Sequence, residues 1–151
     1  MHRHKIIDCI TFFDNNFMFE LRYNILKDYV DCFVVCESKF DHKGNEKGKN
    51  FIWKKNFDLK KIKYFYLEKP FPENNDGWKN QAIQREFLLE NLKFASKDDY
   101  VFFSDPDEIP DPKLLINFEL KKNMEFFFKI VLIISLIYLI HLKLRGKEQE
   151  W

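Results

Sequence analysis

The sequence has no excess of charge of either sign. Its 25 basic and 24 acidic residues leave a formal net charge of +1 over 151 residues. Proteins that bind nucleic acids usually carry a strong basic field, so this balance argues against a nucleic-acid partner. The lysine-rich stretches at 43–49 and 54–63 are broken by acids and aromatics, which favours a solvated surface over a phosphate-binding patch.

Cysteine is scarce, and the number of cysteines is odd. Cys9, Cys32 and Cys36 all fall in apolar, strand-like runs. Such surroundings predict reduced thiols in the core rather than a disulfide framework. The interval between Cys32 and Cys36 puts both on one face of a strand and is not a spacing typical of zinc sites.

Apolar runs alternate with polar segments along the chain, and 18 phenylalanines provide material for a large core. Buried strands are predicted at 6–13, 32–36, 63–67 and 100–103. Helices are predicted at 17–28, 78–92 and 111–122. The order strand, helix, strand, strand, helix, strand predicts a single α/β domain whose mainly parallel sheet is flanked by helices.

Apolar spacing predicts which face of each helix is buried. In the first helix, Phe17, Leu21 and Ile25 recur every fourth residue and form the predicted buried stripe, with Met18 and Phe19 alongside. In the second, the predicted buried side consists of Ala82, Ile83, Phe87, Leu88 and Leu89, and the polar side of Asn80, Gln81, Gln84 and Arg85. A loop as long as residues 39–56 is usually functional or mobile in a compact domain.

Residues 100–110 carry the clearest chemical signal. An apolar strand is followed at once by Ser104, Asp105, Asp107 and Glu108. In open α/β sheets, ligands bind just beyond the carboxyl ends of the strands. Alternate carboxylates there can converge on one divalent cation and leave positions for phosphate oxygens. An Asp-x-Asp pair also fits a solvated acidic turn before a helix, so the residues alone leave both interpretations open.

Three separated blocks of sequence occur in a specific order. They are Lys-Ile-Ile-Asp-Cys-Ile-Thr-Phe-Phe at 5–13 with Glu-Leu-Arg at 20–22, Asn-Gln-x-x-Gln-Arg at 80–85, and Ser-Asp-Pro-Asp-Glu-Ile-Pro at 104–110. Together they resemble glycosyltransferase family 17, the family of β-1,4-mannosyl-glycoprotein 4-β-N-acetylglucosaminyltransferases. The resemblance covers about residues 5–122.

The resemblance implies a Rossmann-like fold of the GT-A type, with UDP-N-acetylglucosamine as donor and a β-linked mannose of an N-glycan-like acceptor. It also implies a divalent metal, usually manganese, held at Asp105 and Asp107 with the donor diphosphate. Glu108 would support this site or contact the sugar. Arg85 would reach the diphosphate, or else form an exposed ion pair on its helix. Glu37 would accept bonds from the nucleoside, or else be an ordinary surface acid.

The chain changes character after residue 123. Residues 126–142 are almost unbroken apolar, and a flank that begins with basic residues follows them at 143–151. This pattern matches a short membrane span with its cytoplasmic flank. Residues 2–5 are polar and no long apolar stretch follows them, so we expect neither a signal peptide nor an N-terminal anchor.

The tail has a second interpretation. Family members continue here with alternating aromatic and polar residues and a Pro-Trp-Glu-Gly-Thr-Arg type of run. Codons possible for residues 145–151, read one base earlier, allow Trp-Glu-Gly-Thr-Arg-Val, and residues 131–143 also allow a family-like sequence. We therefore predict a frameshift near 123–129. Residues 1–123 would form the nucleotide-sugar-binding half, and 124–151 an apolar tail with a separate helix.

The sequence thus predicts an incomplete, inactive fragment of a metal-dependent N-acetylglucosaminyltransferase, without its acceptor-binding half and catalytic base. Its partners would be a UDP-sugar donor and a glycan acceptor, and not nucleic acid. We expect a cytoplasmic protein if the tail is a frameshift product, and a membrane-associated one if 126–142 are a genuine anchor. The alternative is a membrane-tethered module that binds a metal or a partner without transferase activity.

Overall fold

The computed structural model describes residues 4–116. The predicted tail at 124–151, with its apolar helix at 126–142, lies outside the described residues. Where a helix was predicted at 111–122, the described part contains a short 3₁₀ turn, η1 (Pro112–Leu114). Within residues 4–116, no helix combines the length and apolarity needed to cross a membrane.

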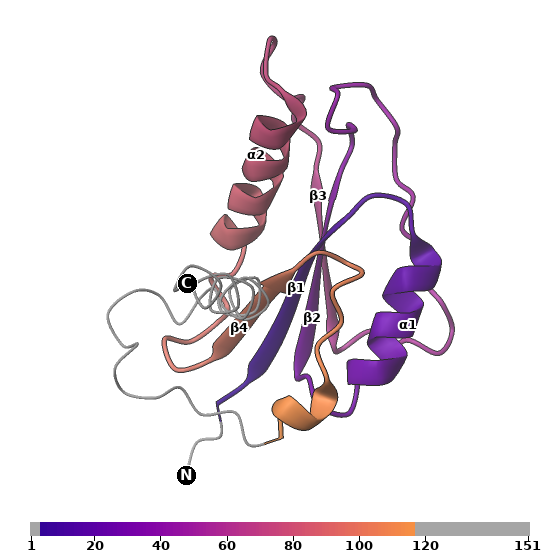
Figure 1. Cartoon of the computed structure of the whole chain (residues 1–151), viewed down its shortest axis with the longest axis vertical. Helices are drawn as coiled ribbons and strands as arrows, with labels where there is room; N and C mark the ends of the chain where they lie inside the picture. The colour runs from indigo at the N-terminus through magenta and orange to yellow at the C-terminus, as the bar shows by residue number, and fades with distance from the viewer. Residues whose placement is uncertain (1–3, 117–151) are drawn as a thin grey trace, which may run out of the picture.

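Four parallel strands form one sheet in the order β3-β2-β1-β4 (Figure 1). The strands are β1 (Ile6–Phe12), β2 (Cys32–Ser38), β3 (Ile62–Leu67) and β4 (Tyr100–Ser104). Every residue of β1 is buried, as expected for an inner strand of a parallel sheet that is covered on both faces. The predicted parallel α/β architecture is confirmed, with strand bounds that differ by only a few residues.

The direction in which strands are added reverses at β1. The chain places β2 and then β3 on one side of β1, and returns with β4 on its other side. Ile10 of β1 lies opposite Val35 of β2 and Ser104 of β4. The carboxyl ends of β1 and β4 therefore flank the point where the connections diverge, which is where doubly wound sheets bind their ligands.

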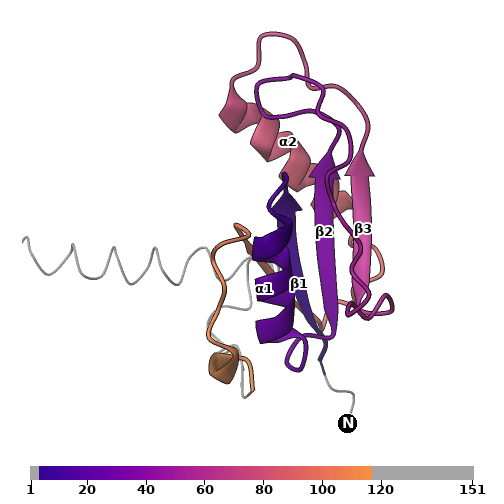
Figure 2. The same cartoon turned by 90° about the vertical axis from the view of Figure 1, so that its right-hand side faces the viewer.

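Helices α1 (Asn16–Leu26) and α2 (Gly77–Glu90) cover opposite faces of the sheet (Figure 2). Successive side chains of β1 point to the two faces. Ile10 packs in one core cluster with Phe19 of α1, and Cys9 packs in the other with Leu88 of α2. The domain therefore has three layers, with separate apolar cores above and below the sheet.

The predicted buried stripe of α1 is wrong. Phe17 is 71% exposed, and Leu21 and Ile25 are also exposed. Of the two residues predicted alongside the stripe, Phe19 is buried and Met18 is half-buried. The buried residues of the helix are Phe19, Arg22, Tyr23 and Leu26. These four residues have helical spacing, but one of them is an arginine, so a search for apolar periodicity alone selects the wrong face.

The predicted faces of α2 are also partly wrong. Leu88 is buried as predicted, but Ala82 and Leu89 are exposed, and Ile83 and Phe87 are half-buried. Asn80 and Gln84, predicted on the polar side, are buried. The Gln84 side-chain amide donates to the carbonyl of Cys36 at 2.8 Å. Such hydrogen bonds compensate for the lost hydration of a buried amide. A pattern of apolar residues in the sequence does not indicate them.

The three cysteines are buried and free, as predicted. Cys9, Cys32 and Cys36 all lie in the core on the α2 side of the sheet. Burial raises the pKa of the Cys36 thiol to about 12, and it also raises the pKa values of the other two thiols. These groups are therefore protonated, unreactive core side chains at neutral pH.

Candidate functional site

A cleft of about 280 Å³ lies at the carboxyl ends of β1 and β4. Its walls come from five parts of the chain: the end of β1, the cap of α1, the long loop, α2 and the acidic turn after β4. Among the lining residues are Thr11, Asn15, His42, Gln81, Asp105 and Asp107. The cleft thus coincides with the switch point of the sheet, where the topology alone favours a ligand site.

Asp105 and Asp107 both line this cleft, and Arg85 approaches Asp105 from α2. Nη2 of Arg85 donates to Oδ1 of Asp105 at 3.0 Å, and both side chains remain partly exposed. The guanidinium also lies over the ring of Phe103. Nε of Arg85 is buried and lacks a hydrogen-bond partner within residues 4–116. Because the rest of the side chain is partly exposed, the guanidinium can also donate to an anion beside Asp105.

Arg22 holds the backbone of the acidic turn from inside the protein. Its Nε and Nη2 donate to the two carboxylate oxygens of Asp8, each at 2.7 Å. Nη2 also donates to the hydroxyl of Ser104 at 2.6 Å. Nη1 donates to the carbonyls of Asp105 at 3.1 Å and Glu108 at 3.0 Å. A buried ion pair between β1 and α1 is therefore continuous with the turn that carries the cleft carboxylates.

Glu108 turns its side chain back onto the turn. Its Oε2 accepts a bond from the backbone N–H of Asp105 at 3.2 Å, and its own N–H donates to the carbonyl of Asp105 at 3.0 Å. The hydroxyl of Ser104 donates to the carbonyl of Glu108 at 3.1 Å. Within the described structure, Glu108 closes the turn, and the cleft wall is formed by its neighbours Asp105 and Asp107.

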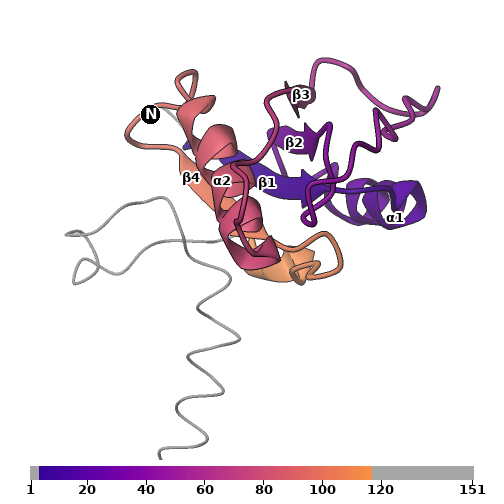
Figure 3. The ribbon, with the colours of Figure 1, turned by 90° about the horizontal axis from the view of Figure 1, so that it is seen from above.

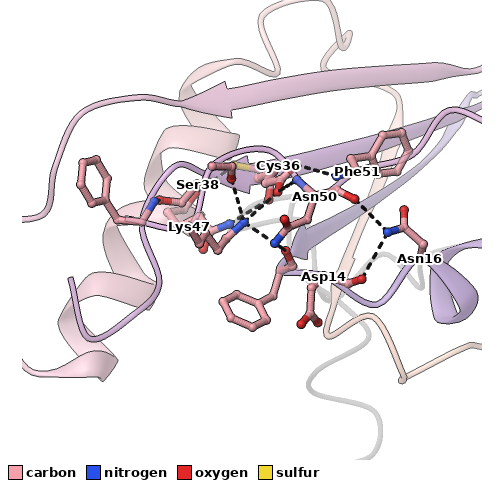
Figure 4. Close-up of polar contacts among 12 residues, drawn as sticks. Asp14, Asn16, Cys36, Ser38, Lys47, Asn50 and Phe51 are labelled. Atoms are coloured by element: carbon pink, nitrogen blue, oxygen red, sulfur yellow. Dashed lines mark hydrogen bonds and ion pairs between the residues drawn. The ribbon is translucent and has the colours of Figure 1, made fainter. Parts of the chain in front are cut away.

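Glu37 is completely buried, so its interpretation as an ordinary surface acid is wrong. Its Oε1 accepts bonds from Nζ of Lys47 at 2.7 Å and from the backbone N–H of Asn50 at 2.6 Å. Its Oε2 accepts bonds from the backbone N–H of Phe51 at 3.2 Å and the hydroxyl of Tyr64 at 2.6 Å. Figure 4 shows the loop residues of this network. The carboxylate is thereby saturated by internal donors.

The long loop at 39–56 is held in place by further bonds. Nζ of Lys47 donates to the carbonyl of Phe13 at 3.0 Å, and the side-chain amide of Asn16 donates to the carbonyl of Asn50 at 2.8 Å (Figure 4). The loop also places His42 in the cleft wall, where its Nε2 lies 2.9 Å from Oε1 of Gln84. The loop is thus fastened to the ends of β1, β2 and α1, and it forms one side of the cleft.

The carboxylates of the cleft suit a metal that is shared with a ligand. Within residues 4–116, no group of three His, Cys, Asp or Glu side chains is arranged to hold a metal. Asp105 and Asp107 nevertheless offer oxygen ligands on one wall, beside the guanidinium of Arg85. This donor set fits a hard divalent cation that takes its remaining ligands from phosphate and water. It does not fit a metal site made of protein ligands alone.

Asp8 and Arg22 were not predicted as a structural pair, although both lie in blocks that carry the family resemblance. One local signal was available. Asp8 is a charged residue in the middle of an otherwise apolar strand, and a buried charge needs a partner. Arg22 is the only basic residue of α1, but the sequence does not show that α1 packs on β1 or that Arg22 faces the sheet. The packing of α1 on the sheet makes that selection.

The chain is similar to known glycosyltransferases. The family profile of glycosyltransferase family 17 matches residues 1–144, and thus extends beyond the boundary predicted at residue 123. The β-1,4-mannosyl-glycoprotein 4-β-N-acetylglucosaminyltransferases of Rattus norvegicus and Homo sapiens are each 31% identical over 117 residues, and that of Mus musculus is 30% identical. These matches cover 70% of this chain and 22% of each relative.

No solved structure matches the chain significantly. The chain spans about a fifth of the length of the curated relatives that it matches. The family profile covers most of the 151 residues, including all three sequence blocks and the acidic turn. The chain belongs to glycosyltransferase family 17.

Proposed function

We propose that this chain is the donor-binding part of a metal-dependent glycosyltransferase that transfers N-acetylglucosamine from UDP-N-acetylglucosamine to a β-linked mannose of an N-glycan-like acceptor. The names of the relatives support the transferred sugar, N-acetylglucosamine, and the β-mannosyl acceptor class. The observation that carries the proposal is that Asp105 and Asp107 line one cleft at the switch point of a parallel sheet, with Arg85 bonded to Asp105 beside it. The same topology supports a fold of the GT-A type.

The residues of the cleft suit the departure of a diphosphate. When bound at Asp105 and Asp107, a divalent metal such as manganese would neutralise the charge that develops on the leaving group. Arg85 would donate guanidinium N–H groups to phosphate oxygens, for which a guanidinium has the appropriate planar geometry. The existing bond between Arg85 and Asp105 keeps both groups oriented toward the same side of the cleft.

Glu37 has a different role in this proposal from the nucleoside contact that the resemblance implied. All its acceptor positions are used by donors of the protein, so a nucleoside would have to displace one of them. We assign Glu37 to holding the loop at 39–56 against the sheet. Glu108 likewise maintains the shape of the acidic turn.

We place the acceptor site and the catalytic base outside this chain, which spans about a fifth of its relatives. On this proposal the chain binds the donor but does not transfer the sugar. We retain the frameshift as the origin of the tail at 124–151, and resequencing the coding region through codon 123 tests it. An intact reading frame, together with membrane insertion of the expressed protein, would instead assign the tail to an anchor.

The donor site is tested by titrating UDP into the wild-type chain and the Asp107→Ala variant, with and without Mn²⁺. We expect binding that depends on Mn²⁺ in the wild type, and affinity at least about tenfold lower in the variant. Asp111→Ala is the matched control, because Asp111 is an exposed acid of the same segment that does not line the cleft. Equal affinity in wild type and Asp107→Ala would remove the metal-site assignment. Calcium binding indifferent to nucleotide would favour a binding module.

A further inference from the structure

We propose that Arg22 is a positioning residue for the donor site: its buried guanidinium sets the backbone of the acidic turn so that Asp105 and Asp107 face the cleft. This inference rests on the proposed donor site. It concerns a residue that is itself fully buried and cannot contact a ligand in the cleft.

The guanidinium is saturated by partners from two directions. On one side Nε and Nη2 form a two-pronged ion pair with Asp8 of β1. On the other side Nη1 faces three carbonyl oxygens, those of Asp105, Pro106 and Glu108, at 3.1, 3.4 and 3.0 Å. With Ser104 also bonded to Nη2, the donors of Arg22 connect the centre of the sheet to the turn.

The direction of these bonds determines where the carboxylates of the turn point. Carbonyls of the turn are drawn inward to Arg22, whereas the side chains of Asp105 and Asp107 line the cleft. Within residues 4–116, the other hydrogen bonds of the turn are short-range contacts within 104–109 and the side-chain bond from Arg85 to Asp105. The orientation of the turn backbone therefore depends mainly on Arg22. Precise placement of ligand groups on rigid elements is what metal and phosphate binding requires.

Two arginines therefore act on the same turn in different ways. Arg85 is partly exposed and bonds the side chain of Asp105, so it can exchange that partner for a phosphate. Arg22 bonds the backbone, and its charge is balanced by Asp8. Removing both members of the Asp8–Arg22 pair leaves the net charge near the cleft unchanged, so a loss of binding would report on position rather than on charge.

The test is the double variant Asp8→Leu/Arg22→Met, which replaces the buried ion pair by apolar side chains of similar size. Such replacements often preserve stability, whereas either single variant would leave an unpaired buried charge. We expect a cooperatively folded protein whose affinity for UDP with Mn²⁺ is at least about tenfold below that of wild type. Calorimetric titration measures the affinity, and thermal unfolding measures the fold.

Leu26→Ala is the matched control. Leu26 is fully buried on the same helix and belongs to the apolar core rather than to the acidic turn. The control should lower the unfolding temperature and leave the affinity unchanged. Arg22→Lys should also bind UDP with Mn²⁺ more weakly than wild type does. An ammonium group keeps the charge but cannot bond Asp8 and the turn carbonyls in the same fork geometry.

The outcomes separate this inference from the proposed function. If the wild type does not bind UDP with Mn²⁺, the proposed donor site itself fails. If the wild type binds and the double variant binds equally well, or Leu26→Ala loses the same affinity, the positioning role is wrong. Should the double variant not fold, Ser104→Ala removes the hydroxyl that bridges Arg22 and Glu108. A drop of about threefold in its affinity is then expected, and no drop would overturn the inference.

Discussion

Acidic residues lie at the carboxyl ends of two of the parallel strands, and the structure uses them in opposite ways. Glu37 lies near the carboxyl end of β2 and is completely buried, whereas Asp107 follows β4 and is exposed in the cleft. Both come after runs of buried strand residues. Position at the carboxyl end of a strand therefore places a carboxylate at the ligand edge of the sheet, but it does not decide whether the carboxylate is available to a ligand.

The difference arises from the segments that follow. After β2 the chain returns over the strand end, so that Lys47, Asn50 and Phe51 donate to Glu37. After β4 the turn is attached through its backbone, and its side chains remain outside. Asp105 has a side-chain partner in Arg85, but both groups are partly exposed and the pair is open to exchange. Buried carboxylates serve structure here, and the exposed ones are free for chemistry.

The largest effect on stability is expected from Glu37→Ala. Removing this carboxylate takes the acceptor from the Tyr64 hydroxyl and from two backbone N–H groups. It also removes the anion that balances the charge of Lys47, which keeps only carbonyl acceptors. We expect the free energy of unfolding to fall by about 3–5 kcal/mol, measured by urea denaturation. Glu46→Ala is the control in the same loop, since Glu46 forms an exposed pair with Lys39, and it should cost less than about 1 kcal/mol. Similar losses in the two variants would contradict the comparison.

A smaller decrease in the free energy of unfolding, again measured by urea denaturation, is expected from Tyr64→Phe, which removes one of the donors to Glu37. A hydrogen bond to a buried charge typically contributes about 1.5 kcal/mol or more, so the variant should be less stable by about that amount near neutral pH.

The effect of Tyr64 should also depend on pH. Burial, and then the hydrogen bond to Glu37, raise the pKa of Tyr64 above its ordinary value. Its stabilising contribution is therefore complete below a pH of about 10 and is lost as the pH rises further, because the unfolded chain releases the proton first. Urea midpoints at a pH of about 8 and about 11 should show the gap between wild type and Tyr64→Phe shrinking. A gap that widens would exclude this explanation.

The smallest effect on stability is expected from Asp107→Ala, the variant that should abolish metal-dependent binding. Asp107 is exposed, and an exposed side chain of this kind usually changes the free energy of unfolding by no more than about 0.5 kcal/mol. Urea denaturation of this variant beside Glu37→Ala compares the two acids directly. A loss above about 2 kcal/mol would assign Asp107 to the structure of the turn rather than to a ligand.

Local pattern in the sequence determined the strands, the parallel α/β architecture, the buried cysteines and the location of the acidic turn. These features depend on runs of a few neighbouring residues and on the rule that parallel strands end at one edge. The three sequence blocks also determined the family, which the profile match establishes independently of the fold.

Only the tertiary structure decided which helix faces are buried and which acids are available. Arg22 reaches the carbonyl of Asp105 across 83 positions, and Glu37 meets Tyr64 across 27. A buried polar group is stable only when distant partners satisfy it, and those partners are chosen by how the elements pack. Hydrophobic periodicity does not detect such pairs. It therefore predicted the wrong buried faces for α1 and α2, where a buried arginine and two buried amides take the place of apolar side chains.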